Sequence, residues 1–138
     1  HAETFSVTKG SARILFVDDE PRFSQTAARI LGKMGYHVTA YESSLEAFDA
    51  FKASPYGFDL VISDVIMPKM TGDTLTAEIK KIRQDLPVVL YTGYADASSS
   101  EVARAAGADD ILLKPVDWER LSRVLHNHLT SKGKGRLD

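Results

Sequence analysis

The chain has 138 residues, of which 43% are apolar and 26% are charged, and its net charge at pH 7 is −2. These values are typical of one globular domain with a buried core, and they argue against an intrinsically disordered chain. So small a net charge gives no reason to expect direct binding to nucleic acid or to a membrane surface. The absence of cysteine excludes disulfides and thiolate metal sites.

The two ends of the sequence differ in composition from the region between them. Residues 1–11 are polar and mixed, and we expect a linker or a remnant of cloning there. Residues 131–138 contain two glycines and several charges, and we expect a flexible tail. Residues 12–130 are then one folded domain. We see neither a signal peptide nor an apolar run long enough to span a bilayer, so we expect a cytoplasmic domain whose parent protein could be membrane-anchored.

Five short apolar runs are spread through the folded region. They lie at residues 14–17, 38–41, 60–62, 88–91 and 111–113. In most of them the apolar residues are consecutive and do not alternate with polar ones. Consecutive apolar residues indicate strands that are covered on both faces, as in a parallel sheet.

Five amphipathic stretches separate and follow these runs, and each predicts a helix. Four of them have apolar residues at helical spacing: Phe23, Ala27, Ile30, Leu31 and Met34; Phe48 and Phe51; Leu75, Ile79 and Ile82; and Leu121, Val124, Leu125 and Leu129. The fourth in chain order, residues 98–106, is short and rich in alanine. Pro21 and Asp117 mark two helix starts, and Ser43 with Glu46 forms a capping box at a third. Gly107 marks a helix end. Strands that alternate with helices in this way predict a doubly wound α/β domain with right-handed crossovers.

Polar residues follow four of the predicted strands at their carboxyl ends. In chain order they are Asp18, Asp19 and Glu20 after the first strand, Asp64 at the third, Thr92 at the fourth and Lys114 at the fifth. Doubly wound sheets bind ligands at the carboxyl ends of their strands. We therefore expect these side chains to converge on one rim of the sheet.

The types of these side chains suit one particular chemistry. Asp18, Asp19 and Asp64 repel one another unless a cation joins them or some are protonated. An oxygen-rich cluster without Cys or His suits Mg²⁺, or alternatively Mn²⁺. With Lys114 as a fixed positive charge and Thr92 as a hydroxyl donor, the set contains the parts needed for phosphoryl transfer to an aspartate.

Each of these residues alone has a plainer interpretation. Acids after a strand often cap a helix or lie in a solvated loop, and a Thr or Lys at a strand end often only ends the strand. The combination favours a functional site, because each element lies at the end of a different strand.

Four segments resemble, in order and in spacing, the receiver domain of response regulators in two-component signalling. They are residues 14–21 (Ile-Leu-Phe-Val-Asp-Asp-Glu-Pro), 58–72 (Phe-Asp-Leu-Val-Ile-Ser-Asp-Val-Ile-Met-Pro-Lys-Met-Thr-Gly), 92–94 (Thr-Gly-Tyr) and 107–115 (Gly-Ala-Asp-Asp-Ile-Leu-Leu-Lys-Pro). The resemblance covers about residues 13 to 130. It implies a flavodoxin-like fold of five parallel strands and five helices, (βα)5.

The resemblance also implies roles for the acidic residues. Asp64 would be the phosphoacceptor. Asp19 would bind Mg²⁺ directly, Asp18 would bind it mainly through water, and the backbone carbonyl of Ile66 would complete the ligands from the protein.

Two further roles follow from the resemblance at the other strand ends. Thr92 would be the switch hydroxyl, and Lys114 would be the lysine that binds the phosphoryl group. The Lys114–Pro115 peptide bond would be cis.

The sequence departs from the family at one position. Most receivers carry Tyr or Phe three residues before the lysine, where this chain has Ile111. In its place we consider Tyr94 a switch residue coupled to Thr92. A tyrosine after strand four without the usual aromatic resembles the receivers attached to hybrid histidine kinases.

The function implied is that of a receiver in a phosphorelay. A histidine kinase or a histidine phosphotransfer protein would donate the phosphoryl group, and the loop after strand four and the fourth helix would then change conformation. Such a domain catalyses its own phosphorylation and dephosphorylation but is not an enzyme with a diffusible product. The sequence leaves open whether the domain forms a homodimer.

Two alternative functions remain. One is a receiver-like binding scaffold that does not signal by phosphate. The other is an aspartate-based phosphatase, although phosphatases usually have Asp-x-Asp after the first strand.

Overall fold

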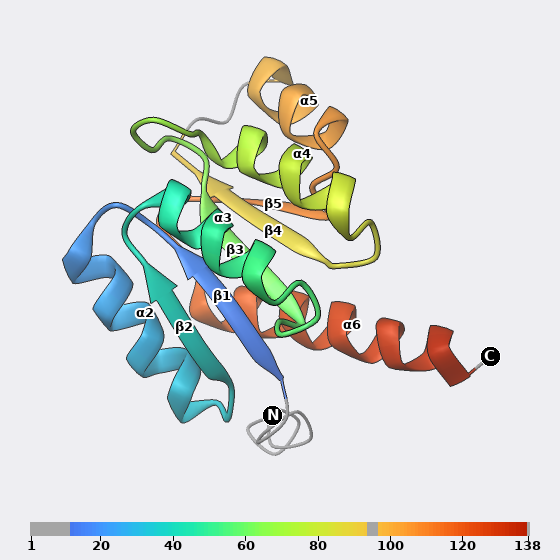
Figure 1. Ribbon diagram of the computed structural model, residues 1–138. Coiled ribbons are helices and arrows are strands. Elements are labelled where there is room, and N and C mark those ends of the chain that lie inside the picture. Colours follow the sequence, from blue (N-terminus) through green and yellow to red (C-terminus); the bar gives the residue numbers. More distant parts are fainter. Residues whose placement is uncertain (1–11, 94–96, 138) are drawn as a thin grey trace.

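A parallel sheet between two layers of helices makes up the fold (Figure 1). The computed structural model describes residues 12–93 and 97–137. Within these ranges the elements in chain order are β1 (Arg13–Val17), α2 (Pro21–Lys33), β2 (His37–Tyr41), α3 (Ser44–Ala53), β3 (Leu60–Asp64), α4 (Gly72–Ile82), β4 (Val88–Thr92), α5 (Ala97–Ala105), β5 (Asp110–Leu113) and α6 (Trp118–Leu137). The strands have the order β2-β1-β3-β4-β5 and all neighbours are parallel, which confirms the predicted doubly wound, flavodoxin-like fold.

The position of a strand in the sheet explains its composition. All residues of β3 and β4, and all but the first of β1, are buried, because these strands lie in the middle of the sheet and are covered on both faces. The edge strands β2 and β5 are less buried. This is why the apolar runs of the central strands are continuous, and why the run at 38–41 is weaker.

Each face of the sheet is covered by its own set of helices (Figure 1). Helices α2 and α6 cover one face, with Leu31, Leu121 and Leu125 in a core against β1, β3 and β4. Helices α3, α4 and α5 cover the other face, where the buried residues include Phe51 and Leu75. Burying a side chain of this size stabilises the fold by about 1.5–3 kcal/mol.

The predicted helix boundaries are confirmed by their hydrogen bonds. The Ser43 hydroxyl accepts from the backbone N–H of Glu46 at 3.2 Å, and the Asp117 carboxylate caps the start of α6. Gly107 follows α5 with φ 108°, a left-handed conformation that favours glycine.

One residue of an expected apolar face lies outside the core. Ile82, expected beside Leu75 and Ile79, is 45% exposed. It is the last residue of α4, and the next residue, Arg83, is buried in the connection that follows. The Arg83 guanidinium donates to the carbonyls of Pro55 at 3.0 Å and Phe58 at 2.7 Å.

The last helix is longer than its apolar pattern indicates. Helix α6 continues to Leu137, past residue 130, where the sequence predicts the end of the domain. The predicted boundaries at residues 11 and 130 stay predictions.

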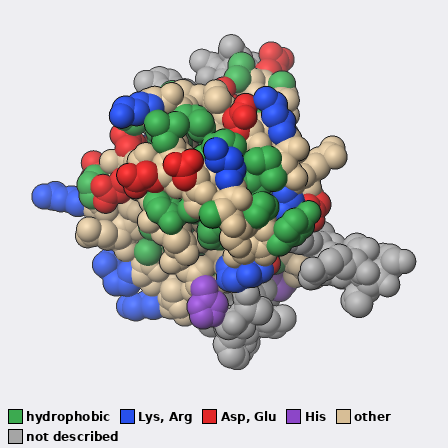
Figure 2. Space-filling view, viewed as in Figure 1, with side chains coloured by type: hydrophobic (Ala, Val, Ile, Leu, Met, Phe, Trp, Pro, Cys, Tyr) green, Lys and Arg blue, Asp and Glu red, His purple; other side chains and the backbone are tan. Residues whose placement is uncertain are grey.

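The face of the molecule seen in Figure 2 carries side chains of several kinds. Figure 2 shows hydrophobic, acidic and basic side chains interspersed on one face, and among the described residues none of the three kinds dominates it. None of the helices in the described ranges combines the length and the apolar character needed to cross a membrane.

Candidate functional site at the carboxyl ends of the strands

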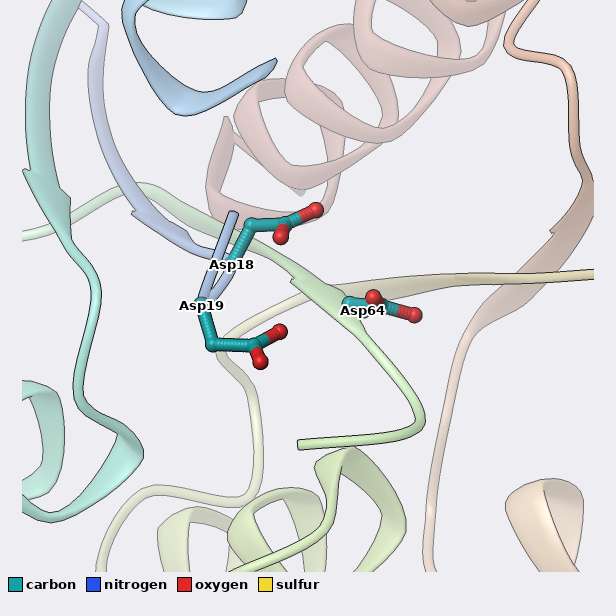
Figure 3. A group of neighbouring side chains, drawn as sticks. All are labelled: Asp18, Asp19 and Asp64. Carbon is teal, nitrogen blue, oxygen red and sulfur yellow. The ribbon is translucent and has the colours of Figure 1, made fainter. Parts of the chain in front are cut away.

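Three aspartates from two neighbouring strands lie together at one rim of the sheet (Figure 3). Asp18 and Asp19 follow β1, and Asp64 is the last residue of β3. Because β1 and β3 are parallel and Val17 pairs with Ser63, their carboxyl ends meet. One carboxylate oxygen from each aspartate lies within 4.8 Å of the others, so the predicted convergence of the acids is observed.

The three carboxylates differ in their surroundings. Asp18 and Asp64 are 2% and 5% exposed, whereas Asp19 is exposed to solvent. Burial raises the pKa of Asp18 above its ordinary value, although hydrogen bonds from Tyr91 and from the backbone of Glu20 oppose this. Oδ1 of Asp64 is buried and has no hydrogen-bond partner among the described residues. A buried carboxylate oxygen without a donor calls for a bound cation or ligand.

A lysine lies on the other side of Asp64. Nζ of Lys114, which follows β5, is 3.0 Å from Oδ2 of Asp64. Thr92 ends the intervening strand β4 and is 3% exposed, and its carbonyl accepts from the backbone N–H of Lys114 at 2.9 Å. The Lys114–Pro115 peptide bond is cis, as predicted. Acid cluster, threonine and lysine therefore lie at the ends of four strands on one rim.

The remaining predicted residues have different positions. Ile66 lies in the connection between β3 and α4 with a side chain that is 57% exposed. Ile111 is half-buried in β5 and packs against the core under α3, α4 and α5. Tyr94 lies outside the described residues, and its role stays a prediction.

Three aromatic residues near the site were not assigned a role from the sequence. A cavity of about 860 Å³ lies beside the acids and Lys114, and Phe23 and Trp118 form part of its apolar wall. The ring of Tyr91, which belongs to β4, lies 5.6 Å from the Phe23 ring, and its hydroxyl donates to Oδ2 of Asp18. A tyrosine in a fully buried strand could have drawn attention, because a buried hydroxyl needs a partner.

The donor set fits a hard divalent cation. The cluster offers only oxygen atoms, one of them buried and without a donor, and magnesium prefers oxygen ligands with few carboxylates. Burial and, to a smaller extent, the neighbouring Asp64 carboxylate raise the pKa of Asp18, and a bound cation would oppose both effects.

The response regulator receiver domain family matches residues 14–126. The chain is a response regulator receiver domain. Receiver domains are the phosphoacceptor modules of two-component systems and take phosphoryl groups from histidine kinases or phosphotransfer proteins. They bind Mg²⁺ at an acidic pocket, which in this chain corresponds to the three-aspartate cluster, and they are not classical enzymes.

Similar proteins include response regulators and a sensor kinase. Two-component response regulator ARR10 of Arabidopsis thaliana is 35% identical over 88% of this chain and 22% of its own length. Sensor kinase CckA of Brucella abortus is 32% identical over 87% of this chain and 13% of its own length. The chain therefore spans less than a quarter of either relative.

Solved structures share the same fold over their whole length. A receiver domain protein from Clostridium thermocellum is 34% identical, with a TM-score of 0.85 over 89% of this chain and 98% of that one. Response regulator TrrA from Thermotoga maritima, solved in complex with Mg²⁺ and BeF, is 31% identical, with a TM-score of 0.78 over 86% of this chain and 100% of that one.

Proposed function

We propose that Asp64 accepts the phosphoryl group, and that the donor is a phosphohistidine of a histidine kinase or histidine phosphotransfer protein. The observation that carries this proposal is the position of the Asp64 carboxylate. It lies near two other aspartates and Lys114, with one oxygen 3.0 Å from Nζ and the other buried and without a hydrogen-bond partner in the described part of the chain. A nucleophile needs an unengaged oxygen and a nearby positive charge for the incoming phosphate, and Asp64 has both.

The same cluster would hold the metal ion. Asp19 and Asp64 would bind Mg²⁺ directly, Asp18 would act mainly through water, and the backbone carbonyl of Ile66 would complete the set; Mn²⁺ is the second candidate. When bound, the ion offsets the negative charge of the carboxylates and of the phosphoryl oxygens. Asp19 suits direct binding because its side chain is exposed, whereas both oxygens of Asp18 already accept hydrogen bonds.

The transfer step uses the residues around Asp64. A carboxylate oxygen of Asp64 forms a bond to phosphorus while the phosphorus–nitrogen bond to histidine breaks. The electron pair of that bond stays on the imidazole nitrogen, which takes up a proton. Lys114 and the Thr92 hydroxyl donate to the phosphoryl oxygens, where negative charge is highest.

The response to phosphorylation would begin at Thr92. Movement of its hydroxyl toward the phosphoryl group would shift the conformation of the loop after β4 and of α5, by biasing an existing equilibrium. We propose Tyr94 as the coupled aromatic residue in this loop. Ile111 would be a fixed packing element, since its branched side chain is stiff and packs against the core.

Incubation with acetyl phosphate and Mg²⁺ tests this function. We expect intact-protein mass spectrometry to detect a single phosphoryl group on each chain, and chelation of the metal should prevent its uptake. Asp19→Asn should raise the Mg²⁺ concentration at which uptake is half-maximal, because it removes the negative charge of a direct ligand. Asp49→Asn removes the same charge from the exposed side of α3, where Asp49 is 76% exposed, and should leave that concentration unchanged. Uptake that continues in excess chelator would contradict the proposed metal site.

A further inference from the structure

Tyr91 combines an apolar setting with a polar contact to the site. It is 2% exposed in β4, and its ring packs at 6.0 Å from the Phe16 ring and 5.6 Å from the Phe23 ring. Its hydroxyl donates to Oδ2 of Asp18 and so joins a buried side chain of the core to the acid cluster.

The two buried aspartates differ in how many of their carboxylate oxygens have a hydrogen-bond partner. Asp18 accepts at both oxygens: the backbone N–H of Glu20 donates to Oδ1 at 2.8 Å, and the Tyr91 hydroxyl donates to Oδ2. Asp64 has one oxygen paired with Lys114 and one with no partner among the described residues. The chain therefore fixes the orientation of the Asp18 carboxylate, and it leaves Asp64 available for a ligand.

We propose that Tyr91 is a positioning residue for the metal site: its hydroxyl holds the Asp18 carboxylate in the orientation in which Asp18 binds the hydrated Mg²⁺. This inference rests on the proposed function of the acid cluster. Each oxygen of Asp18 retains a lone pair after its hydrogen bond and can accept from a water on the ion. Groups that orient metal ligands typically contribute 10–100-fold to metal affinity.

The ring of Tyr91 also faces the other side of the site. Nζ of Lys114 is 5.5 Å from the ring centroid, within the range of a cation–π contact. One buried side chain thus contacts both Asp18, through its hydroxyl, and Lys114, through its ring. Tyr91→Phe removes only the first of these contacts and keeps the packing of the ring, so it isolates the role of the hydroxyl.

The intrinsic fluorescence of Trp118 can report metal binding. Trp118 is the single tryptophan of the chain and lines the cavity that contains Asp18, Asp19 and Asp64. We expect Tyr91→Phe to raise the Mg²⁺ concentration for half-saturation about tenfold. The rate of phosphorylation by acetyl phosphate at saturating Mg²⁺ should change less than about twofold, because excess metal compensates for a weakened site. Tyr36→Phe removes the hydroxyl of another buried tyrosine, a residue that is 5% exposed and precedes β2, and should leave both quantities unchanged.

A double-mutant cycle with Asp18→Asn separates positioning from a general effect on the fold. If the hydroxyl acts through the Asp18 carboxylate, Tyr91→Phe should have little further effect on Mg²⁺ affinity in the Asp18→Asn background. An unchanged affinity in Tyr91→Phe overturns the inference and leaves the proposed function intact. Equal losses in both backgrounds, or a lower rate at saturating Mg²⁺ with unchanged half-saturation, also overturn it. A wild-type protein that binds no Mg²⁺ overturns the proposed function together with the inference.

Discussion

Gly72→Ala should destabilise the domain by about 3 kcal/mol, which corresponds to a fall in melting temperature of roughly 10 °C. Gly72 is the first residue of α4, and its backbone N–H donates to the Val65 carbonyl at 2.7 Å. A Cβ at this position would lie 2.2 Å from the carbonyl oxygen of Asp64 and 2.9 Å from Cα of Val65. Because both are backbone atoms at or directly after the end of β3, they cannot move aside without displacing Asp64, the proposed acceptor.

A second glycine provides the matched control for this measurement. Gly32 lies in the last turn of α2, and a Cβ there would meet nothing within 4 Å. Gly32→Ala should therefore stabilise the domain by about 0.5–1 kcal/mol, since alanine is the better helix former. Thermal melts of the two variants and the wild type give the comparison. A Gly72→Ala variant as stable as wild type would mean that the first residue of α4 does not pack against the end of β3 as described.

Lys114→Met should slow phosphorylation by acetyl phosphate by about 100-fold at saturating Mg²⁺. The ammonium group lies 3.0 Å from Oδ2 of Asp64, where it can offset the charge of the phosphoryl group during transfer. Methionine keeps much of the length and the apolar stem of the side chain but has no charge. The fold should change little, because the Lys114 side chain is 41% exposed.

Lys52→Met is the control for the loss of a positive charge. Lys52 lies near the end of α3 and is 49% exposed, and its Nζ is 3.7 Å from Oδ1 of Asp49 and 4.6 Å from the centroid of the Phe48 ring. Its substitution should leave the rate at the wild-type value. If Lys114→Met and Lys52→Met have the same rate, Lys114 does not act on the phosphoryl group.

The sequence was informative about the fold wherever burial dictates composition. The central strands β1, β3 and β4 are covered on both faces, and their continuous apolar runs predicted them. Edge strands and helix ends are under weaker constraints. For this reason the run at 38–41 was a weak signal, and Ile82 was placed on an apolar face although it is 45% exposed.

The site could be predicted as far as strand topology determines it. Asp18, Asp64 and Lys114 follow parallel strands, so their convergence follows from the order of the sheet. The contact of Tyr91 with Asp18 joins residues 73 positions apart and depends on how the ring packs under α2, which spacing alone does not specify. The same holds for Trp118, whose place in the lining of the cavity beside the acids also depends on packing.

Mapping the phosphoryl group tests the central claim most directly. After reaction with acetyl phosphate and Mg²⁺, the protein is digested under acidic conditions, because an acyl phosphate is stable in acid and labile in base, and its peptides are analysed by tandem mass spectrometry. We predict a base-labile phosphoryl group on Asp64 alone, and no phosphorylation of Asp64→Ala. A phosphoryl group on another residue of the wild type, or uptake by Asp64→Ala equal to that of the wild type, would contradict the assignment of Asp64 as the acceptor.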